Sequence, residues 1–91
     1  MTEEYYAIEM NYYGEIVYLK NLYSYTVGGK LRLYFTFKNR ILDAKRYKTA
    51  RYVQKVVDKI TSWVEDEGKS KEISAKPLKV EAIINIKTTE L

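Results

Sequence analysis

The hydrophobic period of the chain changes near residue 49, and this change constrains the fold more than any other feature. In residues 30–38, "KLRLYFTFK", every second residue is apolar: Leu31, Leu33, Phe35 and Phe37. A period of two is typical of a strand with one face on a core. After Thr49 the apolar residues recur at helical spacing, at Val53, Val56, Val57, Ile60 and Val64. The pattern therefore predicts a sheet followed by one amphipathic helix.

Two further strands are expected upstream, in "EYYAIEM" (4–10) and "EIVYLKNLY" (15–23). In the first, Tyr6, Ile8 and Met10 share a face, whereas in the second either face can be the buried one. The "VGG" before residue 30 predicts a turn, because glycine reaches positive φ without steric cost. Three consecutive strands with short connections favour an antiparallel meander.

The ends of the helix and the last strand are also marked in the sequence. Thr49 is a suitable N-cap and Gly68 a suitable stop. The acidic run 65–67 opposes the helix dipole, so we expect fraying there. A polar linker is expected over 69–77, and the sequence leaves open whether it is ordered. Beyond Pro77, alternation over 78–87 predicts a fourth strand, at an edge or beside the first strand, with one face made of Val80, Ala82, Ile84 and Ile86.

Together these elements predict a single α+β domain over residues 1–91. Its order is strand, strand, strand, helix, strand. We expect two layers: a three- to four-stranded antiparallel sheet covered on one face by a single long helix.

The composition argues against most catalytic chemistry. The chain has no cysteine and no histidine, which removes disulfides, thiolate nucleophiles and the commonest general base. The acids on the expected strands, Glu9, Glu15 and Glu81, have no spacing that brings them together. "VGGK" lacks the spacing of a phosphate-binding loop and precedes a strand. We therefore expect no enzyme and no cofactor.

We expect neither a signal peptide nor a membrane-spanning segment. No apolar run approaches the roughly 20 residues that span a bilayer. The start, "MTEEYYAIEM", is acidic where a signal peptide would be basic and then apolar. We therefore expect a cytoplasmic protein without a membrane partner.

Positive charge is concentrated in the middle third of the chain. The formal net charge is +4, but residues 30–59 alone carry ten basic groups against two aspartates, a net of +8. On the expected helix, basic residues follow three- and four-residue spacing, and others lie just upstream. This pattern indicates an electrostatic footprint for phosphate groups or an acidic protein surface, with plain solvation of the outer helix face as the alternative.

The outward face of the third strand is a second candidate surface, with Arg32, Tyr34, Thr36 and Lys38. Aromatic and cationic side chains on an open sheet suit single-stranded nucleic acid, a protein partner or a second copy of the chain. The sequence leaves these alternatives, and the choice of monomer or homodimer, open. Taken together, the candidate partner-binding residues are Arg32, Tyr34, Lys38, Lys45, Arg46, Lys48, Arg51, Lys55 and Lys59.

The stretch "ILDAKRYKTARYVQKVVDKI" (41–60) resembles small accessory proteins carried by phages of Gram-positive bacteria. In such proteins an Ala-Lys-Arg/Lys-aromatic turn follows a strand hairpin and introduces the helix. The resemblance covers roughly residues 31–60. Ala44 and Tyr47 are then expected to be the inward anchors of the turn, and Thr49 its cap.

The resemblance implies a function as well as a fold. One role of such proteins is to inhibit host defence, notably as anti-CRISPR proteins, which are small, non-enzymatic and often block an effector nuclease. The basic centre of this chain argues against acidic mimicry of DNA. An inhibitor of this charge would bind an acidic protein surface, hold the guide RNA or lock a hinge. We therefore expect a non-enzymatic, phage-type inhibitor of a host protein or ribonucleoprotein in the host cytoplasm; the alternative is a small nucleic-acid-binding protein.

Overall fold

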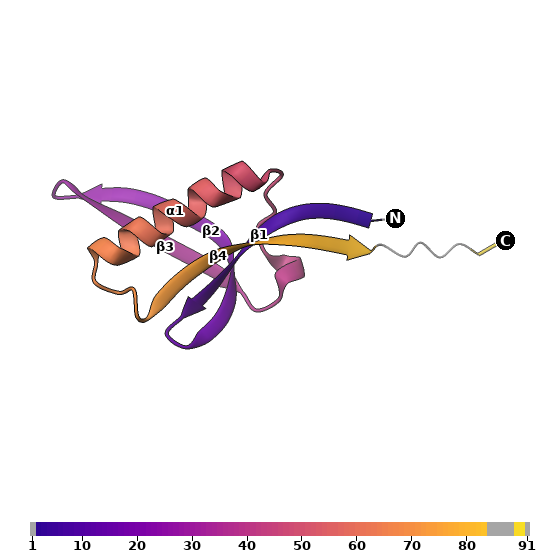
Figure 1. Cartoon of the computed structure of the whole chain (residues 1–91), viewed down its shortest axis with the longest axis horizontal. Coiled ribbons are helices and arrows are strands. Elements are labelled where there is room, and N and C mark those ends of the chain that lie inside the picture. The colour runs from indigo at the N-terminus through magenta and orange to yellow at the C-terminus, as the bar shows by residue number, and fades with distance from the viewer. Residues whose placement is uncertain (1, 84–88, 91) are drawn as a thin grey trace.

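The computed structural model describes residues 2–83 and 89–90 of the chain. Four strands form one antiparallel sheet in the order β3-β2-β1-β4, and a helix packs against it (Figure 1). The elements are β1 (Thr2–Tyr12), β2 (Glu15–Val27), β3 (Lys30–Lys38), the 3₁₀ helix η1 (Ile41–Asp43), α1 (Ala50–Asp66) and β4 (Ile73–Ile83). The predicted α+β class and the order of its strands and helix are confirmed.

The fourth strand begins earlier than its alternation predicts. β4 pairs with β1 along its whole length, from Thr2 opposite Ile83 to Tyr12 opposite Ile73. The expected linker over 69–77 is therefore wrong for residues 73–77. Pro77 lies within β4, which is tolerated because β4 is an edge strand and a missing N–H can face away from its neighbour. The expected places of Ile84 and Ile86 lie outside the described residues.

A bulge in β2 explains why its sequence does not reveal the buried face. The register with β3 shifts between Leu19 and Asn21, so that Lys20 is an extra residue. Before the bulge, Val17 and Leu19 are buried under the helix, and after it Leu22 packs against the same cluster. One extra residue reverses the alternation, because side chains along a strand alternate with a period of two.

The sheet opens into two arms. β1 and β2 pair only between residues 9–12 and 15–18. Beyond this short contact, β2 continues with β3 as the β2–β3 arm, and β1 continues with β4 as the β1–β4 arm (Figure 1). The loop 39–49 bonds to both arms: the Lys45 N–H donates to the Leu19 carbonyl at 3.0 Å, and Tyr6 and Tyr47 exchange two backbone hydrogen bonds of 2.8 Å.

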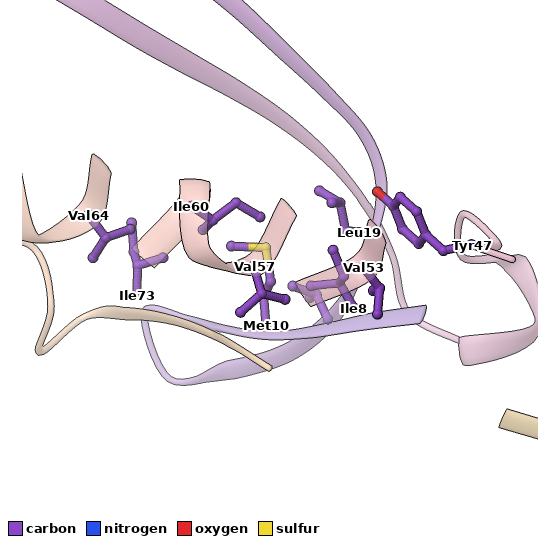
Figure 2. Packing of buried hydrophobic residues seen from close by; sticks show 10 residues of the cluster. Ile8, Met10, Leu19, Tyr47, Val53, Val57, Ile60, Val64 and Ile73 are labelled. Atoms are coloured by element: carbon purple, nitrogen blue, oxygen red, sulfur yellow. The ribbon is translucent and has the colours of Figure 1, made fainter. Parts of the chain in front are cut away.

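The main core lies between the helix and the sheet. Figure 2 shows this cluster, with Val64 and Ile73 at one end and Tyr47 at the other. The composition of this cluster confirms the predicted apolar stripe of the helix. It also confirms the predicted inward face of β1, where Ile8 and Met10 are fully buried. The buried members of the cluster are Ile8, Met10, Val17, Leu19, Tyr47, Val53, Val57, Ile60, Val64 and Ile73.

A smaller cluster lies on the opposite face of β1. Tyr5, Ala7 and Ala44 are buried there, and the η1 residue Ile41 packs against them. Val80 and Ala82 share a face, as predicted, but they belong to this second cluster and not to the one under the helix. The loop 39–49 thus covers part of the sheet face that the helix leaves free, and the far face of the β2–β3 arm stays open.

The helix ends confirm the predicted caps. The Tyr52 N–H donates to the Thr49 hydroxyl at 3.2 Å, and Gly68 ends the helix with a φ of 68°. The unfavourable interaction expected between the acidic run 65–67 and the helix dipole is partly offset by cations of β3. The Glu67 side chain is only 12% exposed and lies 3.3 Å from Lys30 Nζ and 3.4 Å from Arg32 Nη1. These two cations offset the unfavourable charge of Glu67 near the helix dipole.

Candidate functional site

The basic residues of the loop 39–49 have two different roles in the structure. Arg46 is tied to β1: its guanidinium lies 2.9 Å from a Glu3 carboxylate oxygen and 4.4 Å from the centre of the Tyr5 ring. Lys45 and Lys48 are exposed, and Lys45 Nζ lies 5.5 Å from the centre of the Tyr47 ring. Arg46 therefore anchors the loop, whereas Lys45 and Lys48 present their charge to solvent.

A groove of about 260 Å³ runs between α1 and β2, and we call it the basic groove. Lys55 and Lys59, one helical turn apart, line it from the helix, and Lys45 lines it from the loop. Its remaining walls are Leu22, Ser24, Tyr47, Tyr52 and Val56. The groove thus has a partly aromatic floor with ammonium groups along it.

A second concavity of about 560 Å³ lies where the β2–β3 arm meets the loop, and we call it the basal hollow. Its basic lining is Lys20, Lys38, Lys45 and Arg46, with Asn21, Leu42, Asp43 and Ala44 between them. Asp43 is already held by Arg40, with Arg40 Nε 3.1 Å from its carboxylate. Because Lys45 lines both concavities, the basic groove and the basal hollow form one continuous basic surface.

Most cations of this surface have no carboxylate partner. Within residues 2–83 and 89–90, no acidic group lies within salt-bridge distance of Lys20, Lys38, Lys45, Lys48, Arg51, Lys55 or Lys59. Two acidic helix residues lie away from the basic groove: Asp58 accepts a hydrogen bond from Gln54 at 2.9 Å, and Glu65 lines a different concavity beside β4. Asp66 and Glu67 line another concavity with Lys59, at the C-terminal end of the helix. The charged side chains that line the basic groove itself are therefore all positive.

The structure brings together only part of the predicted site. Lys45, Lys55 and Lys59 meet in the basic groove, and Lys38, Lys45 and Arg46 meet in the basal hollow. Lys48 lies beside Lys45 in a third concavity with Thr49 and Tyr52. Arg51 is exposed on the helix and lines none of these three concavities.

Two predicted residues lie apart from the loop. Arg32 is directed to Glu67 at the C-terminal end of α1. Tyr34 is exposed on the far face of the β2–β3 arm, opposite Tyr23. Cations of the loop and the helix flank therefore lie near one another, whereas Arg32 lies apart from them.

Sequence reasoning missed Lys20, Tyr23, Tyr25 and Tyr52. The place of Lys20 in the candidate site could not be predicted from the sequence, because it depends on the bulge in β2. One signal was present in the sequence: residues 16–38 contain no acidic residue at all. A strand hairpin without acids, and with several cations and tyrosines, is a direct indication of a surface that favours anions.

Burial raises the pKa of the Tyr47 phenol, and the neighbouring Tyr52 raises this pKa further. Tyr47 therefore keeps its proton at neutral pH. The Tyr47 side chain therefore adds no negative charge to the basic groove.

Two structural findings and the comparisons with known proteins complete the description of the site. Within the described residues, no group of three or more His, Cys, Asp or Glu side chains is placed to hold a metal ion. The helix that the structure describes is not long and apolar enough to cross a membrane. Protein-family models, curated proteins and solved structures gave no match to the chain.

Proposed function

We propose that the chain is a non-enzymatic binding protein whose continuous basic surface holds the phosphate backbone of a nucleic acid. The observation that carries this proposal is the gathering of unpaired cations from β2, β3, the loop and α1 around Lys45. Cations without carboxylate partners keep their full attraction for an external anion. A phosphate backbone supplies regularly repeated charges, which suits a surface that extends over two joined concavities.

The residue types favour a nucleic acid over an acidic protein. Lysine dominates the surface: of the unpaired cations around the loop and the helix flank, only Arg51 is an arginine. Lysine is depleted at protein–protein interfaces, whereas Lys and Arg contacts to phosphate supply most of the affinity of nucleic-acid binders. The experiment below must therefore distinguish binding of a nucleic acid from binding of an acidic protein.

The inhibitor role extends this proposal. If the nucleic acid is the guide RNA of a CRISPR effector, holding its backbone would block the effector without acidic mimicry of DNA. This role rests on the resemblance over residues 31–60. Its test is whether the chain lowers DNA cleavage by a purified guided nuclease.

The proposal predicts binding to generic oligonucleotides that weakens steeply with salt. Fluorescence anisotropy with labelled single-stranded and duplex oligonucleotides, from about 50 to 200 mM salt, measures it. Lys45→Gln/Lys55→Gln removes two unpaired cations of the basic groove. For single strands, each phosphate contact contributes about 0.7 to the slope of log affinity against log salt, so the variant's slope should be smaller by about 1.4.

The matched control is Lys69→Gln/Lys71→Gln, which also removes two positive charges but lies beyond the far end of α1. It should bind nearly as the unmodified chain does. Equal weakening in both variants would mean that only net charge matters. Absence of any oligonucleotide binding at about 50 mM salt would refute the proposal, and tight binding of polyglutamate in its place would identify an acidic protein partner.

A further inference from the structure

The far face of the β2–β3 arm carries a row of exposed tyrosines. Tyr23 and Tyr34 are direct cross-strand partners, with ring centres 6.3 Å apart, and their residues are 55% and 58% exposed. Tyr25 is half exposed one pair further along the same face, opposite Arg32. Adjacent large aromatic side chains that no other element covers are an unusual feature of a solvated surface.

Cations lie at both ends of this row: Arg32, which is paired with Glu67, at one end and Lys38 at the other. On β3, Arg32, Tyr34, Thr36 and Lys38 alternate with the inward residues and so share the far face. Lys38 also lines the basal hollow with Lys20. Residues 16–38 contain no Asp or Glu, and Glu67 at the end of α1 pairs, among the described residues, only with the cations near the tip of the arm, Lys30 and Arg32. The tyrosine row therefore leads directly into the basic surface.

We infer that the far face of the β2–β3 arm is a stacking platform for unpaired bases of a single-stranded nucleic acid, whose backbone continues into the basal hollow. This inference rests on the proposed function and names its substrate class. Aromatic side chains on which bases stack, beside a positive groove that follows the backbone, are the two components that single-strand binders combine.

The spacing of the arm suits such a path. Strand residues rise about 3.3 Å each, so Tyr34 lies about 13 Å from Lys38 along β3. Bases stacked on Tyr34 and Tyr23 would leave the adjoining phosphates within reach of Lys38 and Lys20. Exposed rings select single strands because bases inside a duplex already stack on each other and offer no free face.

The backbone that carries these rings is a firmly held part of the sheet. Tyr23 and Tyr34 belong to the paired, hydrogen-bonded part of β2 and β3. The opposite face of the arm is fixed to the core by Leu22 and Phe35, which are themselves a cross-strand pair. Because the backbone of the arm is already ordered, little conformational entropy of the backbone is lost when a base stacks on it, and this favours binding.

The test compares Tyr23→Leu/Tyr34→Leu with Tyr23→Phe/Tyr34→Phe by anisotropy, using one labelled oligonucleotide as a single strand and as a duplex. Leucine keeps an apolar side chain and leaves no cavity at these exposed positions, but it has no ring on which a base can stack. Phenylalanine keeps the ring and removes the hydroxyl. Circular dichroism and the unfolding midpoint confirm that both variants fold.

We expect the single strand to bind more tightly than the duplex, and the Leu variant to bind the single strand at least about tenfold more weakly. The Phe variant should retain most of the affinity, and the Leu variant should keep the salt slope of the unmodified chain. Ultraviolet crosslinking followed by mass spectrometry should place bound DNA or RNA on Tyr23 or Tyr34.

Two results would overturn the platform while leaving the proposed function intact. One is a Leu variant that binds the single strand as the unmodified chain does, while Lys45→Gln/Lys55→Gln still weakens binding. The other is a duplex that binds as tightly as the single strand. If no oligonucleotide binds at all, both the platform and the proposed function are wrong. A Leu variant that loses binding to polyglutamate or to a second copy of the chain, and not to oligonucleotides, would assign the face to a protein partner.

Discussion

At the scale of single residues, Tyr47 links the stability of the fold to the candidate site. Its ring belongs to the main core and lines the basic groove. Its raised pKa means that the folded chain keeps the phenol proton to a higher pH than the unfolded chain does. The corresponding stability is fully present below the ordinary tyrosine pKa of about 10 and is lost as the pH rises through the folded value.

This linkage predicts the behaviour of Tyr47→Phe. The free energy of unfolding should fall between about pH 9 and pH 11 in both chains, and it should fall less in the variant, which has no phenol at this position. At pH 7 the two chains should differ by less than about 1.5 kcal/mol, because the side chains have similar volumes. Urea denaturation at several pH values measures the difference. An equal fall in both chains would show that burial of Tyr47 does not shift its titration.

Residues whose roles depend on local chemistry were predicted correctly. Thr49 caps the helix, as its residue type and position indicated. Ala44 and Tyr47 are both buried, as expected from the turn that introduces the helix. The ion pair of Arg32 could not be predicted from the sequence, because its partner Glu67 is distant along the chain and no local pattern joins the two.

At the scale of elements, the bulge at Lys20 decides which face of β2 is buried. Insertion of one alanine between Asn21 and Leu22 would place the alanine inward and turn Leu22 outward. Exposing a leucine costs about 1.5–3 kcal/mol. We therefore expect the insertion to lower the free energy of unfolding by about this amount.

The control for this prediction is Lys20→Ala, which keeps the residue count and should change stability by less than about 1 kcal/mol. Chemical denaturation and near-ultraviolet circular dichroism compare the two. Should the insertion variant be as stable as Lys20→Ala, β2 would have another register that buries its apolar residues equally well.

The beginning of β4 shows why one element was predicted only in part. Residues 73–77 contain small and polar side chains and a proline, so they resemble a linker in sequence. They form a strand because β1 extends far enough to pair with them, from Tyr12 opposite Ile73 onward. Pairing with a neighbouring strand thus overrides a weak local preference.

At the scale of the whole molecule, the loop 39–49 connects the two arms of the sheet. Its backbone bonds reach Leu19 on β2 and Tyr6 on β1. We therefore expect the amides of Tyr6 and Tyr47 to exchange with solvent only when the whole molecule unfolds. The amides of Gly28 and Gly29, in the turn at the tip of the β2–β3 arm, should exchange orders of magnitude faster.

Hydrogen exchange followed by nuclear magnetic resonance measures these amides one by one. Rapid exchange at Tyr6 and Tyr47 would mean that the loop opens independently of the core. In that case the basic groove and the basal hollow, which share Lys45, would not form one stable surface.

The sequence by itself determined the type and order of the elements, the helix cap and the buried stripe of the helix. These follow from period, caps and turn residues, which act between neighbours along the chain. Only the tertiary structure decided the bulge in β2, the opening of the sheet and the position of the loop between the arms. Those features depend on backbone pairing and burial between distant residues, and they bring Lys20 and Lys38 to Lys45 and set Tyr23 beside Tyr34.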